Sequence, residues 1–145
     1  MRLHIIRWGI AIIALFGAIT PWIADYNETH IFNPNWPPHA VYHNAQVLAF
    51  TTMANAIALV YLFSAKVKSL WFPWILTALY WHSLALAIFF PNTAWLDPPQ
   101  QADPSQYILG IPGNAFACWV INALLFLLAG MICYGRKRKE TYERS

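Results

Sequence analysis

The chain has 145 residues, which is enough for one domain, and charged residues make up only 10% of it against 59% hydrophobic residues. Soluble domains carry about 25% charged residues, so this composition excludes an ordinary soluble protein. The formal net charge is +3. Because the basic residues border apolar segments, this charge reflects membrane topology, and we expect no nucleic-acid partner.

Four apolar segments of about 20 residues each follow one another along the chain, at 5–23, 41–63, 69–90 and 112–134. A helix of about 20 residues crosses the roughly 30 Å hydrocarbon core of a bilayer. We therefore predict an all-α fold: a four-helix transmembrane bundle that forms a single integral membrane domain over residues 1–145, with a basic tail at 135–145. The basic start of the first segment is also typical of a signal peptide. However, Gly17-Ala18-Ile19-Thr20 is a poor cleavage site, so we expect the segment to be retained.

The basic residues all fall on one side of such a bundle. They are Arg2, Arg7, Lys66, Lys68, Arg136, Lys137, Arg138, Lys139 and Arg144. The connections at 24–40 and 91–111 contain neither Lys nor Arg. Because cytoplasmic segments are enriched in both, we expect a protein of the plasma (inner) membrane with cytoplasmic N- and C-termini and two proline-rich outer loops.

The first outer loop and the start of the second helix gather five ionisable side chains: Asp25, Glu28, His30, His39 and His43. Imidazole transfers protons near neutral pH, and a neighbouring carboxylate can orient it. We therefore identify these five residues as candidates for acid–base catalysis.

His39 and His43 are four residues apart. On a helix that begins near Pro37 they share one face, with Gln46 next on it. This spacing also suits two ligands of a divalent metal, with a loop residue as the third ligand. The alternative is a pair of interfacial histidines that bond loop carbonyls or water.

A second polar layer is predicted inside the membrane. His82 lies eight residues before the end of the third segment, about 12 Å below its outer end. Polar side chains within a bilayer normally face the bundle interior. They either bond neighbouring helices or line a ligand pocket that descends from the outer loop, and the pocket residues would be His82, Asn122, Asn55, Thr51 and Gln46.

The outer-loop sequence NETHIFNPNWPPHAVYH, residues 27–43, resembles the core of an uncharacterised family of small four-pass membrane proteins from bacteria and fungi. The resemblance extends over most of the chain and implies four helices, without a reaction. More distantly, the chain is similar to the sterol-isomerase and sigma-receptor superfamily, whose members bind sterols or lipophilic amines in a membrane pocket. The intramembrane carboxylates of that superfamily are absent, since segments 41–63, 69–90 and 112–134 contain no Asp or Glu.

These patterns favour a small polytopic membrane protein with an outward-facing pocket, lined by His and carboxylate side chains, for a small lipophilic molecule. Acid–base catalysis is an activity that such a pocket allows. The alternative is a non-catalytic accessory or assembly subunit of a membrane complex. The third interpretation is a metal-binding or metal-delivery protein with a divalent metal at His39 and His43. The expected partners are the lipid bilayer, a lipophilic ligand, and a second copy of the chain or another membrane protein.

Overall fold

The computed structural model describes residues 2–64, 67 and 69–144, with side chains described from residue 3 to residue 135 within those ranges. The orientation predicted above rests in part on groups outside the described residues. These are Lys66 and Lys68, and the side chains of Arg2, Arg136, Lys137, Arg138, Lys139 and Arg144.

Helices dominate the described chain, which confirms the all-α fold. The five α-helices of the described residues are α1 (Arg2–Asp25), α2 (Pro38–Phe63), α3 (Trp71–Ala87), α4 (Pro98–Gln101) and α5 (Gly113–Arg144). Between α4 and α5 lie a 3-10 turn, η1 (Pro104–Gln106), and an antiparallel hairpin of β1 (Tyr107–Ile108) and β2 (Ile111–Pro112). Leu109 and Gly110 form the hairpin turn at φ values of 52° and 78°. Positive φ at both central residues is the requirement of a tight hairpin turn.

Three helices of the described chain are long and apolar enough to cross a membrane: Leu3–Asp25, Pro38–Phe63 and Gly113–Gly135. Helix α3 has 17 residues and is shorter than the predicted segment 69–90. After Ala87 the backbone continues as two turns, in which Phe89 and Phe90 donate to the carbonyls of Leu86 and Ala87. Pro91 follows, and the residue before a proline is disfavoured in helical conformation, so the helix ends early.

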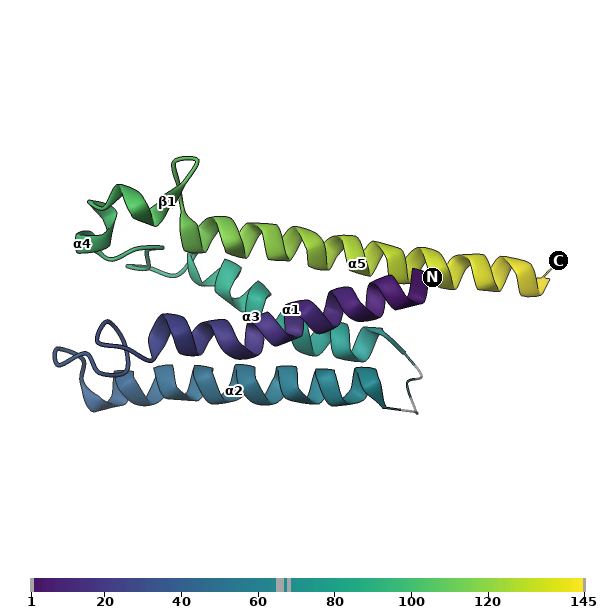
Figure 1. The fold of residues 1–145 in the computed structure, drawn as a ribbon, viewed down its shortest axis with the longest axis horizontal. Helices are drawn as coiled ribbons and strands as arrows, with labels where there is room; N and C mark the ends of the chain where they lie inside the picture. The colour runs from purple at the N-terminus through teal and green to yellow at the C-terminus, as the bar shows by residue number, and fades with distance from the viewer. Residues whose placement is uncertain (1, 65–66, 68, 145) are drawn as a thin grey trace.

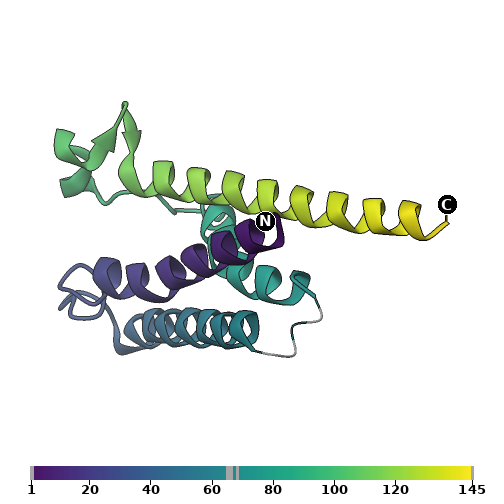
Figure 2. The same cartoon turned by 45° about the vertical axis from the view of Figure 1, so that its right-hand side comes forward.

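The long helices lie roughly side by side, with α1 and α3 between α2 and α5 (Figures 1 and 2). Within the described chain, α2 and α5 share no substantial contact. The two loops predicted above to be outer loops, a name kept here for 24–40 and 91–111, lie at one end of the molecule, and the two termini lie toward the other (Figure 1). The buried apolar core comes from all four long elements: Ile6, Ile10, Ala11, Ile13, Leu62, Ala78, Trp81, Leu125 and Leu128.

Large apolar side chains also cover the outward faces of the long helices. Val60 on α2 is 75% exposed, and Phe126 on α5 is 64% exposed. Such faces are unfavourable in water and suit contact with lipid tails, which are as apolar as these side chains. The surface of the protein therefore agrees with its helix lengths in indicating a membrane protein.

Helix α1 contains Pro21 in its interior. Proline has no N–H, so the carbonyl of Gly17, four residues earlier, lacks its usual helical donor. Thr51 of α2 supplies a replacement, because its Oγ1 donates to the Gly17 carbonyl at 2.9 Å. Hydroxyl side chains of neighbouring helices satisfy backbone freed by proline in membrane helices in this way. The proline thus ties α1 to α2.

Candidate functional site

Helix α1 ends at Asp25, whose carboxylate meets two side chains from later in the chain. Asn44 of α2 donates from Nδ2 to Asp25 Oδ2 at 3.1 Å. His30 Nε2 lies 3.8 Å from Asp25 Oδ1, which is within ion-pair distance but too long for a direct hydrogen bond. Asp25 therefore joins the end of α1, the first outer loop and the first turns of α2.

The loop fixes the direction of the hydrogen bonds at His30. The Thr29 hydroxyl donates to Asn27 Oδ1 at 2.6 Å and lies 2.7 Å from His30 Nδ1. Since its single proton goes to Asn27, the Thr29 oxygen accepts from Nδ1–H of His30. The other ring nitrogen, Nε2, faces the Asp25 carboxylate.

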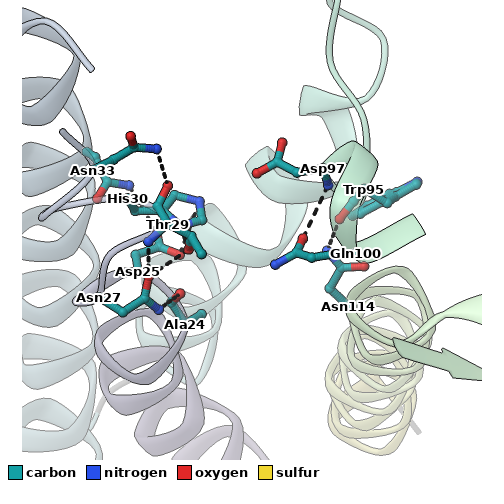
Figure 3. A network of polar contacts seen from close by, with 11 residues as sticks. Ala24, Asp25, Asn27, Thr29, His30, Asn33, Trp95, Asp97, Gln100 and Asn114 are labelled. Carbon is teal, nitrogen blue, oxygen red and sulfur yellow. Dashed lines mark hydrogen bonds and ion pairs between the residues drawn. The ribbon is translucent and has the colours of Figure 1, made fainter. Parts of the chain in front are cut away.

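The second outer loop contains a second cluster of hydrogen-bonded polar side chains. Asp97 begins the short helix α4, and its N–H donates to Gln100 Oε1 at 3.2 Å. Asn114, at the start of α5, donates from Nδ2 to the carbonyl of Trp95. Figure 3 shows this group opposite the Asp25–His30–Thr29 group, with a gap between them.

An open depression of about 540 Å³ lies between these loops. Its polar lining includes one carboxylate from each loop, Glu28 and Asp97. The rest of the lining is mixed, with polar and apolar members: Thr29, Phe32, Asn33, Pro34, Asn35, Pro99 and Gln100. The depression is open to its surroundings, and Glu28 and Asp97 are both exposed.

His39 and His43 lie on α2, beyond this depression. Helix α2 begins at Pro38, next to the start near Pro37 that the sequence predicts, so both histidines lie in its first turns. Their Nε2 atoms are 3.0 Å apart, and His43 Nδ1 is 3.2 Å from Gln46 Oε1. All three side chains are exposed. Among the described residues, no group of three or more His, Cys, Asp or Glu side chains is placed to hold a metal ion.

The deeper polar residues form interhelical contacts. Asn122 of α5 donates from Nδ2 to the carbonyl of Trp81 on α3 at 3.0 Å, and its Oδ1 meets Nδ1 of His82. The His82 ring also stacks against Phe126 at a centroid distance of 5.2 Å. This arrangement joins α3 to α5.

A separate contact joins α1 to α2 at Gly17, whose carbonyl accepts from Thr51. Asn55, one turn further along α2, donates from Nδ2 to the Thr51 carbonyl at 2.8 Å, a bond within α2. Its side chain and the indole of Trp81 both face Gly17 of α1, where a Cβ atom would lie 2.8 Å from Asn55 Nδ2 and 3.2 Å from Trp81 Nε1. Asn55 Oδ1 and Trp81 Nε1 are a buried acceptor and a buried donor without a hydrogen-bond partner among the described residues. Trp81 thus contributes to both interhelical contacts.

The structure therefore distributes the predicted site residues over four places. Asp25 ends α1 beside Glu28 and His30 of the first outer loop, and the exposed trio His39, His43 and Gln46 lies on α2. The contact between α1 and α2 holds Thr51 and Asn55, and the contact between α3 and α5 holds His82 and Asn122. The depression is lined by Glu28 and by none of the deeper residues.

Sequence reasoning missed several participants: Thr29, Asn44, Asp97 and Gln100. Asp97 and Gln100 follow the Asp-x-x-Gln pattern of a helix N-terminus, which was a usable signal. The bond of Asn44 to Asp25 joins residues 19 positions apart and depends on how α1 and α2 are aligned. No local pattern reports that alignment.

The apolar spans, lipid-facing surfaces and polar interhelical contacts define a small α-helical membrane protein with several passes. The chain belongs to a family of unknown function, DUF6640, whose family model matches residues 9–124. No curated protein and no solved structure matches the chain. Membership in an uncharacterised family agrees with the resemblance of residues 27–43, and the distant similarity to sterol isomerases stays a prediction.

Proposed function

We propose that this protein crosses the plasma membrane four times, with both termini in the cytoplasm. It would bind a small amphiphilic molecule between its two outer loops. The ligand's positively charged head would lie in the depression between Glu28 and Asp97, and its apolar part would extend along the bundle surface.

Two observations support the fourth span. Residues of both outer loops line one depression, so the chain returns between them to the end of the molecule where α1 finished. Helix α3, which makes this return, contains no charged residue and packs against α1, α2 and α5. The segregation of Lys and Arg into the other connections supports cytoplasmic termini.

The negative charge of the depression is the reason for proposing a ligand with a positively charged head. Glu28 and Asp97 come from different loops and line the same space. Neither 24–40 nor 91–111 contains a Lys or Arg that would neutralise them. Both residues are exposed, so an ammonium group gains a modest, solvent-screened attraction from the two carboxylates, whereas an anionic head would be repelled.

Acid–base chemistry has a defined route in this arrangement. Thr29 lines the depression, its hydroxyl contacts Nδ1 of His30, and Nε2 of His30 faces Asp25. A relay through Thr29 would move a ligand proton onto the Thr29 oxygen while the hydroxyl proton passes to Nδ1, which requires the His30 tautomer with its proton on Nε2, toward Asp25. Catalysis is therefore proposed as a property of Thr29, His30 and Asp25, separate from ligand binding by Glu28 and Asp97.

Binding of two probes with equal alkyl chains tests the ligand. We expect decylammonium to bind the protein in maltoside micelles and decanoate not to bind, with titration followed by NMR shifts of the outer-loop amides. Glu28→Gln and Asp97→Asn should each weaken decylammonium binding, by up to about fivefold for a solvent-accessible charge pair. Asp103→Asn is the matched control, because it removes a carboxylate from the same outer surface outside the depression. Equal binding of both probes, or equal losses in all three variants, would contradict the proposal.

One observation favours the alternative of an accessory subunit. Helix α5 is the least covered of the three long spans in the described chain. In its most apolar stretch 22% of the residues are buried, against 33% in α1 and α2. A photo-crosslinking residue at Ala123, on the exposed face of α5, tests this function. A discrete protein adduct would support it, and adducts to lipid alone would reject it.

A further inference from the structure

The histidine pair of α2 has the spacing of two metal ligands. A zinc or copper ion lies about 2.0–2.1 Å from each imidazole nitrogen. Two such nitrogens are therefore about 2.9 Å apart when they subtend a right angle at the metal, and about 3.3 Å apart at the tetrahedral angle. The Nε2 atoms of His39 and His43 are 3.0 Å apart, close to the right-angle value. In the metal-free structure this contact is a hydrogen bond between the rings, so a bound metal would take the place of the proton between them.

The side chain of Gln46 orients the ring of His43. Its Oε1 lies 3.2 Å from Nδ1 of His43, and a carbonyl oxygen can only accept. The proton of neutral His43 is therefore on Nδ1, and the lone pair is on Nε2, toward His39. Metal-ligating histidines are commonly held in this way, with the second ring nitrogen donating to an oxygen.

The pair also lies where dissolved ions can reach it. Asn44, the residue after His43, bonds to Asp25 at the outer end of α1, so the histidines lie at or beyond the level where the apolar part of α1 stops. Both rings are exposed, and α1 and α3 pack against other faces of α2. The ring of Tyr42 lies parallel to that of His39, with 6.2 Å between the ring centroids.

We propose that His39 and His43 form an outward-facing site for a Cu²⁺ ion, oriented by Gln46. Two nitrogens that subtend about a right angle at the metal suit the tetragonal geometry of Cu²⁺. Cu²⁺ also has the highest affinity of the first-row divalent ions for nitrogen ligands. The described residues offer no third His, Cys, Asp or Glu ligand, so water occupies the remaining positions. An ion held by two side chains exchanges readily, as a site for capture and transfer requires. This site is independent of the proposed ligand depression.

The test titrates Cu²⁺ into the detergent-purified full chain and reads the bound ion by electron paramagnetic resonance. The protein should carry an affinity tag without histidine and the His4→Ala substitution, which removes the histidine nearest the terminal amine. We expect one ion per chain with the signature of two imidazole nitrogens. His39→Ala and His43→Ala should each remove one nitrogen and lower the affinity by more than tenfold. Gln46→Leu should keep both nitrogens and lower the affinity by about tenfold or less.

His30→Ala is the matched control, because it removes an outer histidine away from the pair, and it should leave the spectrum unchanged. Circular dichroism of each variant separates loss of the site from loss of the helices. Retention of two-nitrogen coordination in His39→Ala, or its loss in His30→Ala, would overturn the site. Tighter binding of Zn²⁺ than of Cu²⁺ in a competition titration would overturn the assignment to Cu²⁺.

Discussion

The backbone carbonyl of Gly17 accepts a hydrogen bond from Thr51 Oγ1 at 2.9 Å, and it is the carbonyl that Pro21 leaves without a helical donor. The bond therefore compensates for a defect in α1 with a side chain of α2. If this is the role of the bond, the contribution of Thr51 to the free energy of unfolding depends on the presence of Pro21.

A double-mutant cycle measures this dependence. We expect Thr51→Val to lower the free energy of unfolding by about 0.5–2 kcal/mol, because the Gly17 carbonyl is left unsatisfied in an apolar interior. In a Pro21→Ala background, residue 21 regains an N–H and the same substitution should cost less. Unfolding in mixed micelles, followed by tryptophan fluorescence, gives both values. Equal costs in the two backgrounds would show that Thr51 acts independently of the proline.

Asn122 should be a main polar contributor to the contact between α3 and α5. Asn122→Leu removes its bonds to the Trp81 carbonyl and to His82, so we expect a loss of about 0.5–2 kcal/mol in the same unfolding measurement. Ala123→Leu changes the adjacent, exposed position and should leave stability unchanged. A comparable loss in both variants would point to a general disturbance of α5.

Two glycines of the long helices should respond differently to an added methyl group. A Cβ at Gly17 would lie 2.8 Å from Asn55 Nδ2, whereas a Cβ at Gly130 meets nothing within 4 Å. We therefore expect Gly17→Ala to lower the free energy of unfolding by about 1–3 kcal/mol through overpacking. Gly130→Ala should be neutral or slightly stabilising. The cost of Gly17→Ala should fall in an Asn55→Ala background, and an undiminished cost would place the clash elsewhere.

The proposed four-span topology predicts that the two outer loops are reached from the same side. Single cysteines at Thr29→Cys and Ser105→Cys, in a background with Cys118→Ala and Cys133→Ala, should both react with an impermeant maleimide added to intact cells. A reporter fused after the last residue should stay protected. Labelling of one cysteine alone would mean that α3 does not cross the bilayer, because α3 is the segment that separates them.

The acidic loop residue Asp103 gives a pH-dependent prediction. Hydrogen bonds from the Ser105 side chain and backbone, with a further one from Gln106, lower the pKa of the Asp103 carboxyl below its ordinary value. The stabilisation from this group is therefore present above the unfolded pKa of about 3.9 and is lost as the pH falls through the lower folded value. Ser105→Ala should raise the pKa of Asp103 toward the ordinary value in a carbon-13 NMR titration. Thr29→Ala, in the other loop, should leave it in place.

The sequence predicted best those features that depend on the chemistry of the local segment alone, namely the apolar helices and the proline at a helix start. Four apolar segments each contain a helix, and α2 begins at Pro38, next to the predicted start near Pro37, because proline fits the first helical position. The end of α3 was less predictable. The apolar run continues through Phe90, but the turns after Ala87 and the proline at position 91 end the helix, and hydropathy does not register either effect.

The candidate site was predicted as a set of residues and not as an arrangement. The i, i+4 spacing of His39 and His43 predicted that the two side chains are neighbours, because both lie on one helix, and their Nε2 atoms are in contact. Which helix Asn122 would face depended on the rotation of α5, and the same holds for Asn55 on α2. Periodicity places polar residues on one face of a helix without identifying the neighbour of that face. The sequence left two roles open for these residues, bonding between helices or lining a descending pocket, and in the structure they lie in two separate interhelical contacts that share Trp81.

The short length of α3 has a consequence for the surrounding lipid. Its 17 residues span about 25 Å, and it runs obliquely between its neighbours (Figure 1), which shortens its reach along the bundle further. The apolar part of α5, Gly113–Gly135, spans about 35 Å. In the proposed four-span topology, one bilayer cannot match both lengths, so it would thin beside α3 and thicken beside α5. Hydrophobic mismatch of this kind sorts proteins among membranes of different thickness, and here it would make a thin bilayer the preferred environment of α3.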